Sequence, residues 1–213
     1  RLAARAARRS GAGLLTVAAT SGLCPLFSAD APGVITSSAD DAALFSTLLE
    51  DARKNAVLVG PGHGVSEHTR SIVEVALQAE RAVVLDADAL TVFAGQATAL
   101  SSMIKAPAVL TPHQGEFVRL FPGLSGSKLE IARAAAGLVG AVVVLKGSDT
   151  VIAAPDGRAA INCNAPPWLA TGGTGDVLAG TILGLLTQGM PAFEAAAAGV
   201  WINGAAANRF GPG

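Results

Sequence analysis

Cysteine, histidine and tyrosine are scarce in this chain of 213 residues. The two cysteines, Cys24 and Cys163, stand far apart, the three histidines show no H-E-x-x-H spacing, and tyrosine is absent. These counts exclude a disulfide-stapled scaffold and a cysteine-rich zinc site. Because so few thiols are typical of proteins from a reducing compartment, we expect a cytoplasmic protein.

Charged residues are also sparse, at 15% of the chain. Lys and Arg total 15 and Asp and Glu total 16, which gives a formal net charge of -1. A protein that binds nucleic acid or an anionic membrane surface needs an excess of basic residues. We therefore expect neither a nucleic acid nor a membrane as a partner.

Long hydrophobic runs are missing as well, although the mean hydropathy is +0.49. The best candidate, residues 177–186, is followed by Thr187-Gln188-Gly189 and then by Pro191. A membrane-spanning helix needs about 20 apolar residues. We therefore interpret this segment as a buried helix, and the high hydropathy as a consequence of abundant alanine.

Hydrophobic residues make up 51% of the chain, which is enough to bury a sizeable core. The length, with no repeat or linker, favours one domain over residues 1–213. The basic residues 1–9 could suggest a transit peptide. They run directly into Gly11 and Gly13, as the end of a helix does, so we interpret them as part of the domain.

Short apolar runs alternate with helical patterns along the chain. The runs predict strands at 14–18, 56–59, 82–85, 108–110 and 141–145, and an Asp-Gly turn predicts a hairpin of 150–154 with 158–163. Helices are predicted at about 2–10, 40–53, 66–80, 89–94, 116–120, 127–138, 176–188 and 191–208. Because the strands are continuously apolar, they predict an α/β fold: a mostly parallel sheet with helices on both faces and one small antiparallel hairpin.

Polar or glycine-rich turns follow these strands. Ligands of such sheets bind beyond the carboxyl ends of the strands, so these turns predict the position of the site. The turns are residues 60–64, 86–88, 111–116, 146–150 and the glycine-rich segment 171–176.

The segment 171–176 is the most informative of the five. The glycines let the amides of Gly173, Thr174 and Gly175 crowd around one anion, and the helix that follows adds its positive dipole end. Asp176, in the first turn of that helix, could act as a general base toward an alcohol that attacks a phosphate. Alternatively, Asp176 only stabilises the helix N-terminus, by ~0.3–1 kcal/mol. No P-loop sequence is present, and residues 60–64 lack the third glycine of a dinucleotide fingerprint.

Of four other candidates, three have a structural alternative. Glu116 could order a magnesium ion through water, or could be a solvated capping carboxylate. Asp86 and Asp88 could bind magnesium or sugar hydroxyls, although Asp88 could instead cap the helix at 89–94. Lys146 could contact a nucleotide phosphate, or could be a surface lysine.

Aromatic and histidine side chains give weaker signals. Trp168 could stack on a base, whereas Trp201 is expected in the core. His113 on its own is more often a structural histidine than a ligand. His63 and His68 are expected on the surface.

Together these segments resemble one family, the ADP/ATP-dependent NAD(P)H-hydrate dehydratases of the ribokinase-like superfamily. The Gly-x-Gly-Asp turn marks the superfamily, and the Thr-Pro-His and Asp-Ala-Asp-Ala-Leu segments narrow it to this family. The resemblance implies a three-layer ribokinase-like fold. The matching segments cover nearly the whole chain: 59–62 (VGPG), 85–90 (LDADAL), 110–117 (LTPHQGEF), 144–147 (VLKG), 150–157 (TVIAAPDG) and 169–180 (LATGGTGDVLAG).

The resemblance implies repair of hydrated NADH and NADPH (NADHX and NADPHX). ADP or ATP phosphorylates the C6 hydroxyl, and loss of phosphate restores the dihydronicotinamide ring. Asp176 would be the catalytic base, and Gly62, His113 and Asp176 would contact the substrate. Glu116 would belong to a segment that orders Mg²⁺. The nucleotide would be held by Lys146, Gly147, Ser148, Asp149, Thr150, Gly173, Thr174 and Gly175.

This sequence departs from the family pattern in two places. The family begins with a strand and a glycine-rich turn before the helix that here starts at Arg1. Near the end, Asn203 stands where the family often has histidine, and the usual tail is absent. A longer parent could carry, or be paired with, an epimerase domain. The apolar surplus and the resemblance suggest a homo-oligomer, with a tetramer expected, and leave the choice between ADP and ATP open.

Two other functions fit the same turn. One is a small-molecule kinase for a vitamin-precursor alcohol of the hydroxymethylpyrimidine or hydroxyethylthiazole type. The other is a nucleotide-binding remnant without catalysis. The Thr-Pro-His segment and the absence of a lid cysteine favour the dehydratase over the kinase.

Overall fold

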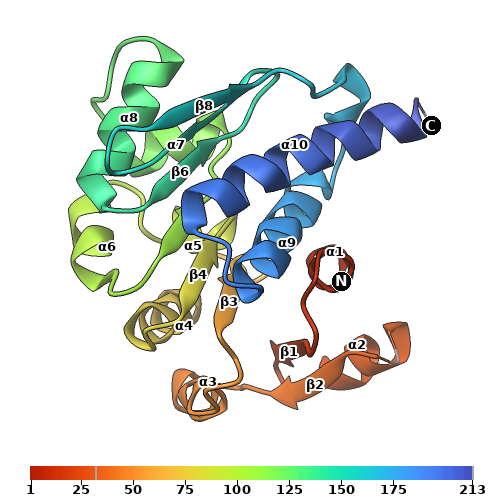
Figure 1. Ribbon diagram of the computed structural model, residues 1–213. Coiled ribbons are helices and arrows are strands. Elements are labelled where there is room, and N and C mark those ends of the chain that lie inside the picture. The colour runs from red at the N-terminus through yellow and green to blue at the C-terminus, as the bar shows by residue number, and fades with distance from the viewer. Residues whose placement is uncertain (32, 213) are drawn as a thin grey trace.

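The computed structural model describes residues 1–31 and 33–212, and within these ranges the strands form two sheets (Figure 1). The larger sheet has six strands in chain order. The first four strands pair in parallel, the fifth pairs antiparallel with the fourth, and the sixth pairs antiparallel with the fifth. The predicted parallel sheet and hairpin are confirmed. The strands are β3 (Ala56–Val59), β4 (Ala82–Leu85), β5 (Ala108–Leu110), β6 (Val142–Leu145), β7 (Thr150–Ala153) and β8 (Ala159–Asn162).

The register of the parallel strands brings their carboxyl ends to one edge. Leu85 of β4 pairs with Val59 of β3 on one side and with Leu110 of β5 on the other. The turns that begin at Gly60, Asp86 and Thr111 therefore emerge side by side. This edge is where a ligand of a parallel sheet is expected.

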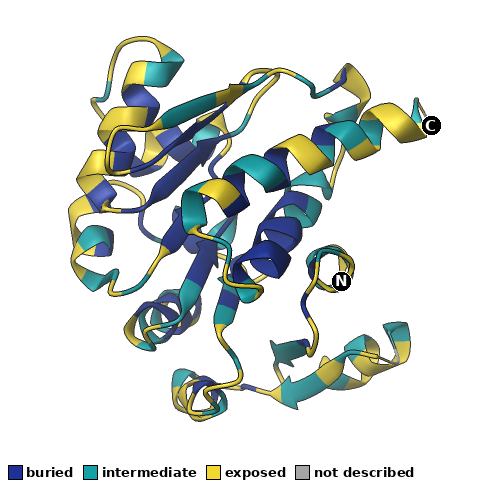
Figure 2. Cartoon of the chain, viewed as in Figure 1, coloured by how far each residue is buried: buried dark blue, intermediate teal, exposed yellow. Residues whose placement is uncertain are grey.

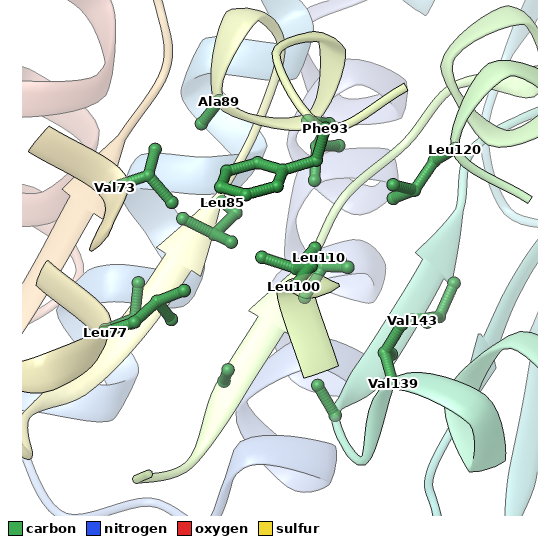
Figure 3. Packing of buried hydrophobic residues seen from close by; sticks show 14 of the residues in the cluster. Val73, Leu77, Leu85, Ala89, Phe93, Leu100, Leu110, Leu120, Val139 and Val143 are labelled. Carbon is green, nitrogen blue, oxygen red and sulfur yellow. The ribbon is translucent and has the colours of Figure 1, made fainter. Parts of the chain in front are cut away.

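Helices cover both faces of the sheet, and for this reason its strands are continuously apolar. One face packs against a core that contains Leu77, Phe93 and Leu110 (Figure 3). The helices on this side are α3 (Ala42–Leu49), α4 (Glu67–Gln78), α5 (Asp88–Thr91), α6 (Ala97–Met103), α7 (Gln114–Leu120) and α8 (Lys128–Val139).

The opposite face is covered by α1 (Leu2–Arg9), α9 (Thr174–Thr187) and α10 (Ala192–Phe210). Val84 and Val109 of the sheet and Ile182 of α9 belong to the core on this side. Central α9 is largely buried, whereas α10 keeps an exposed outer face (Figure 2). The predicted three-layer arrangement is confirmed.

Two glycines let α1 and α9 pack backbone to backbone. A Cβ on Gly180 would collide with the carbonyl of Ala3, and one on Gly184 would lie 2.6 Å from the carbonyl oxygen of Ala7. Neither position has room for a side chain. The glycines inside α9 therefore set how closely the first helix approaches the core.

The smaller sheet pairs β1 (Thr16–Ala19) with β2 (Ile35–Ser38) in parallel, and α2 (Cys24–Asp30) lies between them in the chain. Val17 packs against the core of the α9 side and Ala18 against the other core. The small sheet therefore lies in the same layer as the large one. Among the described residues no ladder joins β1 to β3.

The sequence missed α2, β2, α6 and the short 3₁₀ helix η1 (Pro167–Leu169). It also placed Trp201 in the core, which is wrong, because 60% of this residue is exposed on the outer face of α10. His63 and His68 are exposed, as predicted. No helix in the described part of the chain is long and apolar enough to span a membrane.

Candidate functional site

A cleft of about 660 Å³ lies at the carboxyl edge of the sheet, where β4, β5 and β6 end opposite the N-terminus of α9. Five segments that are distant in the sequence meet there. The lining residues are Asp86, Ala87, His113, Glu116, Lys146, Gly147, Ser148, Thr150, Asn162, Ala165, Pro166, Pro167, Leu169, Ala170, Gly173, Thr174, Gly175, Asp176, Leu178, Val200 and Asn203.

The glycine turn presents free amides to this cleft. Gly173 is the N-cap of α9 and has φ +88°, a conformation that favours glycine. The hydroxyl of Thr174 donates to the carbonyl of Thr171 at 2.9 Å, which holds the turn. Within the described residues, the amides of Gly173 and Gly175 donate to no acceptor. The turn can therefore receive an anion at the positive end of a helix of 14 residues.

Asp176 lies in the first turn of α9, beside these amides, and lines the cleft. It is partly buried, and no hydrogen bond to its carboxylate is made within residues 1–31 and 33–212. The carboxylate is thus available to a ligand. A base held against an anion site is the arrangement that transfer of a phosphoryl group to an alcohol requires.

Lys146 is not a surface lysine, because only 19% of its side chain is exposed. Its Nζ donates to Oδ1 of Asp86 at 2.8 Å and lies 4.0 Å from Oε2 of Glu116. A Cβ on Gly175 would lie 3.3 Å from this ammonium. The ammonium therefore lies directly against the glycine turn, on the floor of the cleft.

His113 and Glu116 cap α7 reciprocally. Nδ1 of His113 accepts from the amides of Gly115 and Glu116 at 2.9 and 3.2 Å, and Oε2 of Glu116 accepts from the His113 amide at 2.8 Å. Because Nδ1 is an acceptor, a neutral His113 carries its proton on Nε2. The capping role raised as the alternative for Glu116 is therefore confirmed, but the carboxylate is buried, 7% exposed, and not solvated as that alternative had it. Both side chains also line the cleft.

The loop between β6 and β7 is held by its own side chains and by α8. The hydroxyl of Thr150 accepts from the amide of Gly147 and donates to its carbonyl, at 3.2 and 2.9 Å. Lys128 donates to the carbonyl and to Oδ1 of Asp149 at 2.7 and 2.8 Å. The hydrogen bond from Lys128 to the carboxylate holds the pKa of Asp149 below its usual range. Gly147, Ser148 and Thr150 line the cleft, whereas Asp149 lies outside it.

The turn at residues 60–64 lies next to the cleft rather than in its wall. Gly60 has φ +129° and packs against the carbonyl of Asp86, where a side chain would collide. The amide of Gly64 donates to Oδ2 of Asp88 at 2.8 Å. The prediction that Asp88 caps the next helix is wrong: Asp88 is the first residue of α5, and its carboxylate holds this turn instead. Gly62 is exposed and does not line the cleft.

Trp168 does not line the cleft either. Its indole Nε1 donates to the carbonyl of Ala207 in α10 at 3.1 Å, which fixes the ring against that helix. Its neighbours Pro167 and Leu169 form part of the wall. The base-stacking role of Trp168 stays a prediction, and the apolar wall of the cleft comes from the residues beside it.

Sequence reasoning missed Asn162, noted Asn203 only as a departure from the family pattern, and left the role of Asp86 open. Asn162 ends β8 and Asn203 lies in α10, and neither is preceded by a parallel strand. Asp86, 1% exposed, was named as a candidate ligand of magnesium or of sugar hydroxyls, and its pairing with Lys146 was not predicted. A polar residue at the end of the hairpin was the one available signal for Asn162.

The three-layer sheet and the glycine turn at the mouth of α9 define a protein of the ribokinase-like fold class. A ribokinase-like superfamily protein from Enterococcus faecalis has a TM-score of 0.84 at 29% identity, over 98% of this chain and 73% of that chain. A hydroxyethylthiazole kinase from Pyrococcus horikoshii shares the fold at a TM-score of 0.62 and 19% identity, over 99% of this chain and 88% of that chain. The sequence model described as NAD(P)H-hydrate dehydratase matches residues 1–211, and the chain belongs to that family.

Relatives in this family are similar over nearly the whole chain. A bifunctional NAD(P)H-hydrate repair enzyme from Salinibacter ruber is 41% identical over 99% of this chain and 41% of its own length. The ADP/ATP-dependent NAD(P)H-hydrate dehydratase from Bacillus subtilis, co-crystallised with ATP/Mg²⁺ and soaked with CoA, has a TM-score of 0.83 at 34% identity, over 98% of this chain and 76% of that chain. The chain thus spans about two fifths of the length of the curated relatives.

Proposed function

We propose that this chain catalyses the ADP- or ATP-dependent dehydration of hydrated NADH and NADPH. One observation carries the proposal: a single cleft joins the glycine turn, Asp176 and Lys146 in a chain that matches the dehydratase family over residues 1–211. The bifunctional repair enzymes and the Bacillus subtilis dehydratase support the substrate and the donor.

In this proposal the nucleotide phosphates lie between the glycine turn and the loop after β6. The amides of Gly173 to Gly175 hold the transferring phosphoryl group, and Lys146 adds a positive charge beside them. Gly147, Ser148 and Thr150 contact the rest of the nucleotide from the opposite wall. Asp149, held by Lys128, shapes this loop.

Asp176 and His113 act on the substrate. The Asp176 carboxylate accepts the proton of the C6 hydroxyl as its oxygen attacks the terminal phosphorus, and the bond from that phosphorus to the leaving nucleotide breaks. The C6–O bond of the phosphate ester then breaks as the ring nitrogen lone pair forms a C=N bond. Loss of the C5 proton returns the electrons and restores the C5–C6 double bond. His113 contacts the dinucleotide from the rim, and Gly62 contacts it from the neighbouring turn.

The residues of the cleft fit a magnesium ion that arrives with the nucleotide. The lining includes three carboxylates, Asp86, Glu116 and Asp176, and one ammonium, Lys146, so an incoming polyphosphate needs a counter-charge. Within the described residues no three His, Cys, Asp or Glu side chains converge as a metal-binding group. Magnesium keeps several of its waters, so Glu116 would contact it through water. The bound ion would neutralise charge on the phosphates.

The proposal is tested by incubating the purified chain with hydrated NADH and either ADP or ATP. We expect the near-ultraviolet absorbance of the dihydronicotinamide ring to return only when nucleotide and magnesium are both present. A parallel reaction with hydroxymethylpyrimidine and hydroxyethylthiazole tests the kinase alternative. Phosphorylation of those alcohols, with no recovery of NADH absorbance, would contradict the proposal.

We also propose that residues 1–213 form one dehydratase domain that acts in the cytoplasm. The two free cysteines support a reducing compartment. The repair enzymes of similar sequence are bifunctional, which supports a fused or paired epimerase.

Trp201, Ile202 and Phe210 are exposed on α10 and support self-association, with a tetramer expected. Light scattering coupled to gel filtration tests the oligomeric state.

A further inference from the structure

The Asp86 carboxylate is buried under the nucleotide cleft, and the reaction proposed above gives it no contact with substrate or nucleotide. Only 1% of the residue is exposed, and Oδ1 accepts from Lys146 Nζ and from the Thr111 hydroxyl, both at 2.8 Å. We propose that Asp86 is a positioning residue, which fixes the ammonium of Lys146 at the phosphate position beside Gly175. The inference rests on the proposed nucleotide-dependent function.

The geometry places the ammonium where a phosphate would need it. Lys146 leaves the end of β6, and its Nζ lies 3.3 Å from the position of a Cβ on Gly175, in the turn that offers free amides. The Asp86 Oδ2 lies 3.9 Å from the same position. A lysine side chain has four rotatable bonds and loses much conformational freedom when it is fixed. An ammonium that is already held by Asp86 has lost that freedom before the nucleotide arrives.

Asp86 is itself held rigidly. Thr111, which is fully buried, donates its hydroxyl to Asp86 Oδ1. The next residue, Ala87, has φ +50°, a left-handed conformation that is rare for a residue with a side chain and that is frequent at functional sites. Gly60 packs against the Asp86 carbonyl with no space for a side chain. Thr111 therefore holds the carboxylate of Asp86, and Gly60 and Ala87 constrain its backbone.

A second carboxylate competes for the same ammonium. Oε2 of Glu116 lies 4.0 Å from Lys146 Nζ and already accepts from the His113 amide at 2.8 Å. Without Asp86, Glu116 would be the nearest carboxylate to Lys146. The ammonium would then move away from the glycine turn, and the cap of α7 would be disturbed. Asp86 thus selects one of two positions for Lys146.

A double-mutant cycle tests the inference, with two readouts: ADP affinity by titration calorimetry, and the KM and kcat for the nucleotide. The variants are Asp86→Ala, Lys146→Ala and their combination. We expect Asp86→Ala alone to weaken ADP binding and to raise the nucleotide KM by about tenfold or more, and to change either by less than about threefold in the Lys146→Ala background. Equal losses in both backgrounds would overturn the inference, because Asp86 would then act independently of Lys146. An Asp86→Ala variant that binds ADP like the wild type would overturn it as well.

Two controls separate positioning from folding and from the proposed reaction. Asp86→Asn keeps the size of the side chain and an acceptor for Thr111. We expect an intermediate rise in KM, and a smaller fall in melting temperature than for Asp86→Ala, because Lys146 loses its charged partner but keeps a hydrogen-bond acceptor. A wild-type KM would count against a role for the charge. Calorimetry with ADP does not depend on the reaction. A non-additive binding cycle in a chain that does not dehydrate hydrated NADH would uphold the positioning role and refute the proposed function. A wild-type chain that binds neither ADP nor ATP would overturn both.

Discussion

The ammonium of Lys128 donates to both the carbonyl and the carboxylate of Asp149, at 2.7 and 2.8 Å. Through this pair, α8 fixes the loop that forms one wall of the cleft. Lys128→Met should raise the nucleotide KM by about three- to fivefold with little change in kcat, because a partly exposed pair contributes at most about 1 kcal/mol. Steady-state kinetics with varied ADP measures this.

A matched control for Lys128 is the ion pair of Lys54 with Asp51, at 3.1 Å, which does not line the cleft. Lys54→Met should leave the nucleotide KM unchanged. Equal effects of the two substitutions would show that the loss at Lys128 comes from general charge and not from the shape of the loop.

Asp176→Asn should keep nucleotide binding but lower turnover by about 10²–10⁴-fold, the usual contribution of a general base. The substitution removes the base but preserves the size of the side chain in the first turn of α9. Calorimetry with ADP and single-turnover kinetics measure the two effects separately. A variant with turnover like that of the wild type would remove Asp176 from this role.

Lys146→Ala should raise the nucleotide KM more than it lowers kcat, because the ammonium contacts the phosphates before and during transfer. The substitution also leaves Asp86 buried without its charged partner, so the variant should melt at a lower temperature. Kinetics at saturating and subsaturating ADP, with a melting curve for each preparation, resolve the two effects. A fall in kcat alone would contradict a role in nucleotide binding.

Gly180→Ala should destabilise the fold by about 1–3 kcal/mol, because the added Cβ collides with the carbonyl of Ala3 and α1 must move away from α9. Gly137→Ala is the control: Gly137 lies in α8, is exposed, and has no atom within 4 Å of the position of a Cβ. That substitution should stabilise the chain by about 0.4–1 kcal/mol. Urea unfolding of both variants measures the two changes in the free energy of unfolding, which should have opposite signs.

The parallel strands could be predicted closely from the sequence. The runs at 56–59, 82–85 and 108–110 match β3, β4 and β5 in both bounds, because a strand buried on both faces must be continuously apolar. The run at β2 reads Ile-Thr-Ser-Ser and has no such signal. Trp201 was placed on the wrong side of α10 because alanine occurs all round that helix and leaves no clear apolar stripe.

The candidate site could be predicted only in part. The turn at 146–150 follows β6 and leads into β7, and the turn at 171–176 follows η1 and opens α9. Their polar or glycine-rich sequence alone indicated their role. The pairing of Lys146 with Asp86 joins residues 60 positions apart and depends on the register of three strands. The clamp of Lys128 on Asp149 likewise depends on where α8 packs, and no local pattern encodes it.

The most direct test of the proposed reaction follows the oxygen of the C6 hydroxyl. NADH is hydrated in water that carries a heavy oxygen isotope, then treated with the chain, ADP or ATP and magnesium, and the released inorganic phosphate is analysed by mass spectrometry. We predict one labelled oxygen in each phosphate, because the C6 oxygen is transferred to phosphorus before the C6–O bond breaks. Unlabelled phosphate together with restored NADH would contradict phosphorylation of the hydroxyl.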